Sequence, residues 1–353
     1  MKLNFSAPIN NTGYGIASFN ILKALLLSDL DITYFPIGGP TVNFQEEYDL
    51  LVSLIKKRES CDISAPHFKI WHQFDLLEHI GKGKYFALPF FELDTFNQQE
   101  KTSLGVPDIL FTTTEWAKGV VVNNGIKTPV QVIPLGVDRT IFNDNNKPIK
   151  NNDKYIFLNI GKWEVRKGHD ILLELFETAF PNETDVELHI LASETTNSYS
   201  SKQELEQWKQ MYNRPRIKLY PGVKTHQDIA SLIASSSCGL YPSRAEGWNM
   251  ELLETMSMNK PVIATNYSSH TEFCSKDNAF LIDIDSKEKA VDGKAFVGQG
   301  SWAKIDKKEK DQIIDHMRYV YKNRIITNPA GVITAQKYSW ANSANLIKGC
   351  IFS

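Results

Sequence analysis

Cysteine, metal-binding spacings and long apolar runs are all scarce in this chain of 353 residues. The four cysteines, Cys61, Cys238, Cys274 and Cys350, are scattered and form no C-x-x-C pair, so we expect no disulfide framework. The eight histidines show no H-x-x-x-H or Cys/His spacing, so we predict no metal site. These absences fit a reducing, cytoplasmic setting.

Charge of one sign is also lacking. The formal net charge is -2, which disfavours nucleic acid as a partner, although a local basic groove would still admit it. No apolar run is long enough to predict an integral membrane span. The N-terminus, MKLNFSAPIN, has no apolar core of the kind a signal peptide needs, so we expect no secretory leader.

Strands and helices alternate along the chain, and the alternation starts twice. Apolar patterns predict a strand, a helix and a strand over 2–37, and the same order begins again at 155. Two such openings predict an α/β protein with two Rossmann-like, doubly wound domains. We expect these at 1–145 and 151–336, joined by the polar linker 143–154. A last helix within 337–353 would close the second domain or return to complete the first.

The loop 161–168, GKWEVRKG, is the first candidate site. It lies between a predicted buried strand and a helix, where ligands of open α/β sheets bind. Free N–H groups at a helix start attract anions, and Lys162, Arg166 and Lys167 add positive charge. The loop therefore suits a diphosphate, although a solvated charged loop would read the same way.

The segment 243–265, SRAEGWNMELLETMSMNKPVIAT, is the second candidate site. Asn249 is a favoured N-cap for a helix that starts at Met250. Glu254 has methionines at i−4 and i+4 instead of a cation, and an unpaired carboxylate among apolar neighbours is costly. Two ribose hydroxyls would satisfy it, and Glu246 would hold a sugar hydroxyl. Both glutamates would otherwise be structural.

Five motifs, which follow one another along the chain in the order that the family has, resemble those of the retaining glycosyltransferases of family four, which use nucleotide sugars. Glu246 and Glu254 have that family's glutamate spacing, and PVIA follows the helix. NIGKWEVRKGHD resembles the family's glycine and basic loop, with Lys162 where arginine is usual. NNTGYGIAS, VIPLGVDRTIF and YSWANSANLI resemble its first glycine loop, its hinge strand and its closing helix. The likeness covers nearly the whole chain and is strongest over 155–285.

The resemblance implies the GT-B fold, with two Rossmann-like domains facing across a cleft. It also implies a retaining, metal-independent hexosyl- or pentosyltransferase without a cofactor, which takes a UDP- or GDP-linked sugar. Lys162 and Lys167 would neutralise the diphosphate, and together with Glu246 they form the implied catalytic set. Donor contacts are implied for Gly13, Gly15, Gly161, Gly247, Trp248, Asn249, Met250, Glu254 and, near the base, Val223.

The acceptor side is less clearly marked. The resemblance implies a glycan, a lipid-linked or another hydroxyl acceptor on the first domain. Many relatives have a histidine at a strand end there, and this chain offers Glu92, Asp94 or His72. A satisfied structural histidine is the alternative for His72.

Two rival functions remain from the sequence. A catalytically inactive sugar-nucleotide-binding protein would bind the donor without turnover, and the presence of Glu246, Glu254, Lys162 and Lys167 together disfavours it. An NAD-dependent oxidoreductase would use the Gly13–Gly15 loop, but that loop lacks the third glycine of the dinucleotide fingerprint. Its acidic residue should also follow the next strand, whereas Asp29 and Asp31 precede it.

Overall fold

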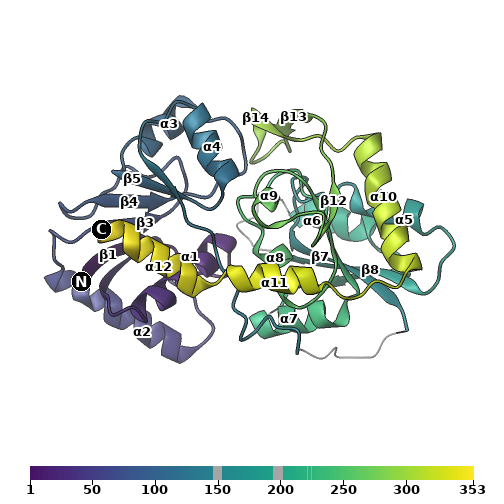
Figure 1. Ribbon diagram of the computed structural model, residues 1–353, viewed down its shortest axis with the longest axis horizontal. Helices are drawn as coiled ribbons and strands as arrows, with labels where there is room; N and C mark the ends of the chain where they lie inside the picture. Colours follow the sequence, from purple (N-terminus) through teal and green to yellow (C-terminus); the bar gives the residue numbers. More distant parts are fainter. Residues whose placement is uncertain (146–152, 194–201, 221, 224) are drawn as a thin grey trace. The chain divides into compact units, whose positions relative to one another are not determined.

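The chain forms two compact units, each described here by itself (Figure 1). The computed structural model describes residues 1–145, 153–193, 202–220, 222–223 and 225–353. Unit 1 comprises Met1–Gly136 and Tyr338–Ser353, and unit 2 comprises Val137–Lys337. Most of the predicted linker, residues 146–152, lies outside the described residues.

Unit 1 contains a sheet of six parallel strands in the order β2-β1-β3-β4-β5-β6. The strands are β1 (Lys2–Ala7), β2 (Asp31–Pro36), β3 (His67–Ile70), β4 (Tyr85–Leu88), β5 (Ile109–Thr112) and β6 (Val130–Val132). The helices are α1 (Gly13–Leu26), α2 (Gln45–Lys56), the 3₁₀ turn η1 (Lys57–Ser60), α3 (Gln98–Leu104), α4 (Glu115–Asn123) and α12 (Trp340–Ile351).

The last helix, α12, returns to unit 1 and packs along α1. The Ser343 hydroxyl donates to the Pro134 carbonyl at 2.6 Å, and Lys348 Nζ donates to the Ser28 carbonyl at 2.7 Å. Its buried side chains include Ala344 and Ile347. The C-terminal segment therefore completes the first core, which is one of the two placements that its sequence allowed.

Unit 2 contains a second sheet of six parallel strands in the order β12-β11-β10-β7-β8-β9. Its strands are β7 (Tyr155–Lys162), β8 (Val186–Ser193), β9 (Ile217–Tyr220), β10 (Cys238–Tyr241), β11 (Val262–Thr265) and β12 (Phe280–Ile282), and a separate antiparallel hairpin is formed by β13 (Lys287–Val291) and β14 (Val297–Ala303). Its helices are α5 (Leu172–Ala179), α6 (Lys202–Met211), α7 (His226–Ser235), α8 (Met250–Ser257), α9 (His270–Phe273), α10 (Lys307–Lys322) and α11 (Pro329–Lys337).

Strand β7 is the centre of the second core. Its first seven residues are buried, and it pairs with β8 over its whole length. A continuous apolar run is what a parallel strand covered on both faces requires. Residues such as Phe157, Leu188 and Leu240 join α5 and α10 in one hydrophobic cluster. The predicted α/β architecture of two Rossmann-like units is confirmed.

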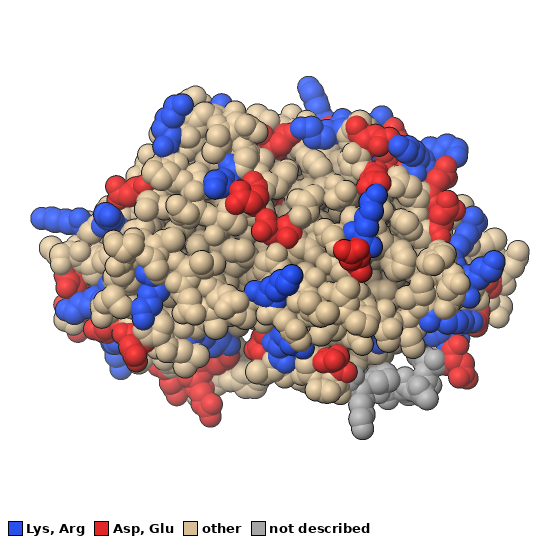
Figure 2. Space-filling model, in the orientation of Figure 1, with Lys and Arg blue, Asp and Glu red and all other residues tan. Residues whose placement is uncertain are grey.

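No helix in the described part of the chain combines the length and apolarity that a bilayer crossing requires. On the face drawn in Figure 2, lysine and arginine are interspersed with aspartate and glutamate.

Candidate functional site

The candidate site in unit 2 lies where the direction of strand succession reverses. From β7 the chain proceeds outward to β8 and β9, whereas β10 lies on the other side of β7. The loops that follow β7 and β10 therefore lead in opposite directions from the carboxyl edge of the sheet. Open α/β proteins bind ligands at such a switch point.

Glu246 is the charged centre of this site. Its side chain is buried, and it accepts hydrogen bonds from Arg166 Nη1 at 2.7 Å and from the Ser243 hydroxyl at 2.7 Å. Lys167 Nζ lies 2.9 Å from Glu246 Oε1, whereas Arg166 binds Oε2. Burial alone would raise the pKa of Glu246, but Lys167 and Arg166 outweigh it and hold this pKa well below its usual range. Glu246 is therefore a fixed, ionised carboxylate.

Lys167 is held as firmly as its partner. Burial alone would lower the pKa of its ammonium, but Glu246, and then Glu251 in the first turn of α8, raise it. The aliphatic part of Lys167 packs over Gly161, where an added Cβ would lie 3.1 Å from Lys167 Cδ. The structure thus brings together three of the predicted residues, Gly161, Lys167 and Glu246.

A glycine permits the two loops to approach. Gly168 has φ of +83°, and a Cβ there would lie 2.6 Å from the Pro242 carbonyl oxygen. A side chain at this position would be strained by its backbone conformation and would strike the neighbouring backbone. The lysine–glycine pair of the sequence motif therefore has a structural reason: the lysine pairs with Glu246, and the glycine admits close packing.

Arg244 also connects the two loops, and the sequence analysis missed it. Its guanidinium binds both oxygens of Asp170 at 2.8 Å and also donates to the Val165 carbonyl. Its Nε lies 3.3 Å from Glu288 of the β13–β14 hairpin. A bidentate arginine–carboxylate pair fixes orientation as well as charge. An arginine two residues before Glu246 was the available signal, but its partners are distant in sequence.

Asn249 caps α8, as the sequence predicts. Its Oδ1 accepts from the backbone N–H of Leu252 at 3.3 Å, and its Nδ2 lies 2.8 Å from His270 Nε2. Its φ is +77°, a left-handed conformation that asparagine tolerates better than most residues. Trp248 is buried against Phe273, with ring centroids 5.1 Å apart, so its side chain belongs to the core.

The neighbours of this cap complete the predicted segment. Gly247 is buried in the loop before the cap, and Met250 begins the helix with its side chain partly exposed.

Glu254 lies one turn into α8 and keeps part of its surface exposed. Among the described residues, none forms a hydrogen bond or an ion pair with its carboxylate. Burial first, and then the charges of Glu251 and Asp138, raise the pKa of Glu254 well above its ordinary value. An unpaired carboxylate near two others is unfavourable for the fold alone.

Lys162 and Val223 complete the predicted donor set in unit 2. Lys162 ends β7, is partly exposed, and has no ion-pair partner within the described ranges. Its charge reaches Glu164, whose pKa it helps to lower. Val223 is partly exposed after β9, while residues 221 and 224 of the predicted base loop lie outside the described residues.

The remaining predicted residues lie in unit 1, around Tyr14, which the sequence analysis did not select. Gly13 is the first residue of α1, and His72 lies 4.5 Å from Tyr14 between ring centroids. Burial, and then the charge of Glu92, raise the pKa of Tyr14, whose hydroxyl binds the backbone of Phe90, two residues before Glu92. Asp94 instead accepts at its backbone carbonyl from Asn124 Nδ2, at 3.0 Å.

Gly15 has a structural reason of its own. It is buried in the first turn of α1, and a Cβ there would lie 2.3 Å from the backbone of Asn10. Helix α1 therefore approaches the loop after β1 more closely than any other residue would permit.

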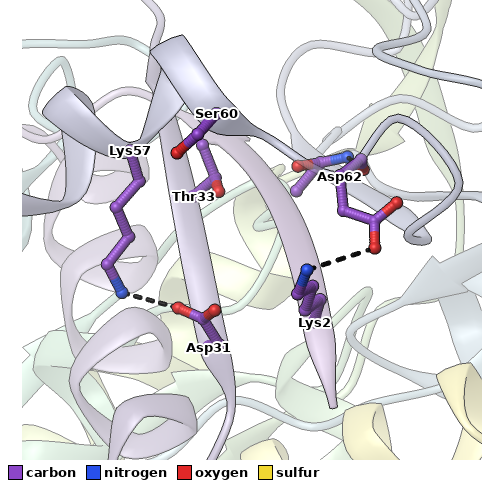
Figure 3. A pocket seen from close by; sticks show the side chains of 7 residues that line it. Lys2, Asp31, Thr33, Lys57, Ser60 and Asp62 are labelled. Atoms are coloured by element: carbon purple, nitrogen blue, oxygen red, sulfur yellow. Dashed lines mark hydrogen bonds and ion pairs between the residues drawn. The ribbon is translucent and has the colours of Figure 1, made fainter.

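A separate polar pocket of about 200 Å³ lies at the opposite, amino ends of β1 and β2 (Figure 3). Lys57 pairs with Asp31 at 2.6 Å and Lys2 with Asp62 at 3.4 Å, so its charges are already balanced. The same pocket is lined by Asn4, Thr33 and Ser60. It shares no residue with the sites above.

Comparison with known proteins agrees with this arrangement. Residues 140–300, which are less than half of the chain, match the model of the family described as glycosyl transferases group 1. Over 206 residues, or 58% of the chain, the sequence is 28% identical to an uncharacterised glycosyltransferase of Methanocaldococcus jannaschii. That match spans 50% of the archaeal protein, so the two chains are compared over half of its length.

Solved structures match over the whole chain. Sucrose-phosphate synthase of Thermosynechococcus elongatus superposes with a TM-score of 0.72 at 13% identity, over 99% of this chain and 98% of that one. HepE of Anabaena, in complex with UDP-glucose, has a TM-score of 0.72 at 15% identity, over 100% of this chain and 99% of that one. The protein therefore has the GT-B fold, built from two Rossmann-like units.

Proposed function

We propose that the protein is a retaining glycosyltransferase that moves a sugar from a nucleoside-diphosphate sugar to an acceptor hydroxyl. The observation that carries the proposal is Glu254, a partly buried carboxylate that no described residue satisfies, one turn inside α8. The cationic loop after β7 reaches the segment just before that helix, because Lys167 pairs with Glu246 at 2.9 Å, four residues before α8 begins. A diol and a diphosphate on one ligand would satisfy both.

The roles follow from the hydrogen-bonding capacity that remains. An ammonium has three donors and a carboxylate about four acceptor positions. Lys167 gives one donor to Glu246, so the others can meet a phosphate. Glu246 accepts from Arg166, Lys167 and Ser243, which leaves capacity for a sugar hydroxyl. Glu254 would accept from both ribose hydroxyls.

The same groups would lower the barrier. Negative charge grows on the diphosphate as the glycosidic bond breaks, and the sugar becomes oxocarbenium-like. Lys167 and the N–H groups at the start of α8 are fixed in advance and would meet this charge, and Lys162 would add a second cation at the end of β7. We propose that they suffice without a metal ion. Retention would follow if the acceptor attacks from the face that the diphosphate leaves, with the phosphate taking its proton.

We also propose that the protein works in the cytoplasm. All four cysteines are free thiols, the state that a reducing cytoplasm maintains. UDP-glucose is the first donor to test, because it is the ligand in the HepE complex. GDP-linked sugars come next.

The test is release of nucleoside diphosphate from sugar nucleotides in the presence of mixed oligosaccharide acceptors, with and without EDTA. We expect release that EDTA does not affect, and an NMR spectrum of the product with the anomeric configuration of the donor. Binding of donor without release would favour the inactive sugar-nucleotide-binding alternative. An inverted anomer would contradict retention, and loss of activity in EDTA would contradict metal independence.

A further inference from the structure

Unit 1 carries a group of aromatic rings at the carboxyl ends of its central strands, formed by Tyr14, Trp71, His72 and Phe74, which we call the aromatic shelf. Trp71 follows β3 directly, and Tyr14 lies in the first turn of α1. The His72 and Phe74 rings are stacked at 5.0 Å with 9° between their planes. Trp71 meets His72 edge to face at 4.6 Å, and Tyr14 meets His72 at 4.5 Å.

Hydrogen bonds fix the rings of the shelf. The indole N–H of Trp71 donates to the Asp75 carboxylate at 2.9 Å. The Tyr14 hydroxyl donates to the Phe90 carbonyl at 2.8 Å and accepts from the Phe90 N–H at 3.0 Å. A tight turn, from the Asp75 N–H to the His72 carbonyl at 3.0 Å, orders the loop itself. The shelf is thus ordered before any ligand arrives, which lowers the entropy cost of binding.

The shelf leaves apolar surface in contact with solvent. Phe74 is 44% exposed and Leu77, three residues later, is 60% exposed, while Trp71 and His72 are each partly exposed. Trp71 packs in part against the core of unit 1, but Phe74 and Leu77 leave apolar surface exposed at the ligand-binding edge of a parallel sheet. Rings at that edge offer a flat face to a ligand.

The charge beside the shelf selects among ligands. Asp75 holds Trp71, and Glu92 follows two residues after Phe90, whose backbone N–H and carbonyl both bind the Tyr14 hydroxyl. Lys69, near the end of β3, is only 2% exposed and lies 3.9 Å from Glu78. A phosphate or sulfate group would meet carboxylates without an accessible lysine, whereas hydroxyl groups would find acceptors.

We propose that the aromatic shelf binds a neutral sugar residue of the acceptor, which stacks on Phe74 and Trp71 and donates hydroxyls to Asp75 and Glu92. The C–H face of a pyranose is slightly positive and suits the negative face of an aromatic ring. This inference rests on the proposed function and names its acceptor class: a neutral glycan, in place of a phosphate-bearing polymer or a lipid chain.

The test uses the full-length protein on an array of neutral, phosphorylated and sulfated oligosaccharides, and in flotation with phosphatidylcholine vesicles. We expect binding to neutral glycans, weakened about 3- to 10-fold by Phe74→Ala, the effect of one aromatic contact. Tyr319→Ala removes an exposed aromatic from unit 2 and Lys57→Ala alters the polar pocket, and both should bind as the unaltered protein does. In transfer assays Phe74→Ala should raise the acceptor KM with kcat nearly unchanged.

Several results would overturn the proposal. These are preference for anionic glycans, binding only to vesicles, no binding on the array, binding unchanged by Phe74→Ala, or binding lost in Lys57→Ala. A thermal-shift measurement with UDP-glucose distinguishes failure of the shelf proposal from failure of the proposed glycosyltransferase function. A donor shift with any of these outcomes refutes only the shelf. Phe74-dependent glycan binding without nucleoside-diphosphate release from any donor refutes the transferase and leaves the sugar site.

Discussion

Replacing Glu254 by glutamine should change stability and ligand binding in opposite directions. In the unliganded protein this carboxylate has no partner within the described ranges, and Glu251 and Asp138 repel it. Its pKa is raised, so at neutral pH the ionised form costs the folded state free energy that the unfolded chain does not bear. Glu254→Gln removes that cost, and the melting temperature of the unliganded protein should rise.

Nucleotide binding should weaken in the same variant. The carboxylate would accept one charge-assisted hydrogen bond from each ribose hydroxyl, and glutamine keeps a single neutral acceptor oxygen. The lost bond is worth about 1.5–3 kcal/mol, which corresponds to roughly a 10- to 150-fold weaker Kd. Glu251→Gln removes the same charge from the same helix and should change the Kd by less than about 3-fold.

A comparison of two ligands on two forms of the protein makes the test specific for the ribose hydroxyl. Calorimetry is run with UDP and 2′-deoxy-UDP, or with the guanosine pair if GDP binds, on the unaltered protein and on Glu254→Gln. The unaltered protein should prefer the ribose ligand, and the variant should lose that preference, a coupling of about 1 kcal/mol or more. Additive effects, or a variant that melts lower when unliganded, would refute the reasoning and make Glu254 structural.

Three further perturbations have defined outcomes. Glu246→Gln leaves the buried Lys167 without its carboxylate partner, while Arg166 keeps its pair with Glu164. It should destabilise the fold by about 3–5 kcal/mol in denaturant titration, whereas loss of the exposed Lys310–Glu174 pair in Glu174→Gln should cost about 1 kcal/mol or less; equal effects would contradict the burial argument. Burial alone would raise the pKa of Glu187 in β8, but hydrogen bonds from Lys154, His189 and Lys218 lower it to about 2. The ionised Glu187 therefore stabilises the folded protein fully above about pH 4.3, and this stabilisation should be lost as the pH falls toward 2. The acid unfolding of Glu187→Gln, followed by circular dichroism, should be less steep than that of the unaltered protein. Gly15→Ala should lower the melting temperature, because its methyl group would strike Asn10, and an unchanged transition would contradict that contact.

Local patterns predicted much of the fold. The buried run of β7, the cap at Asn249 and the alternation of strands with helices are properties of neighbouring residues, so they can be read from the sequence. The pairing of Lys167 with Glu246 joins residues 79 positions apart, and the Arg244–Asp170 pair joins residues 74 apart. Such contacts depend on strand order, which no local pattern encodes.

The same distinction applies to the candidate site. The sequence predicts ligand contacts for the cationic loop and the two glutamates, which stays a prediction, but it does not predict the ion pair of Glu246 with Lys167. Sequence alone would let Glu246 face a ligand freely, whereas the structure gives most of its capacity to Arg166, Lys167 and Ser243. Tyr14 and Phe74 were also overlooked, because aromatic residues in an α/β chain usually belong to the core.

The central claim is that unit 2 binds a nucleoside-diphosphate sugar, and a thermal-shift panel tests it most directly. The panel contains UDP-, GDP-, ADP- and dTDP-sugars and NAD(H), each with and without EDTA, because a ligand of the folded state raises the melting temperature. We predict a rise with a UDP- or GDP-sugar that EDTA does not change and that Lys167→Ala diminishes. A rise with NAD(H) alone, or none with any sugar nucleotide, would contradict the account.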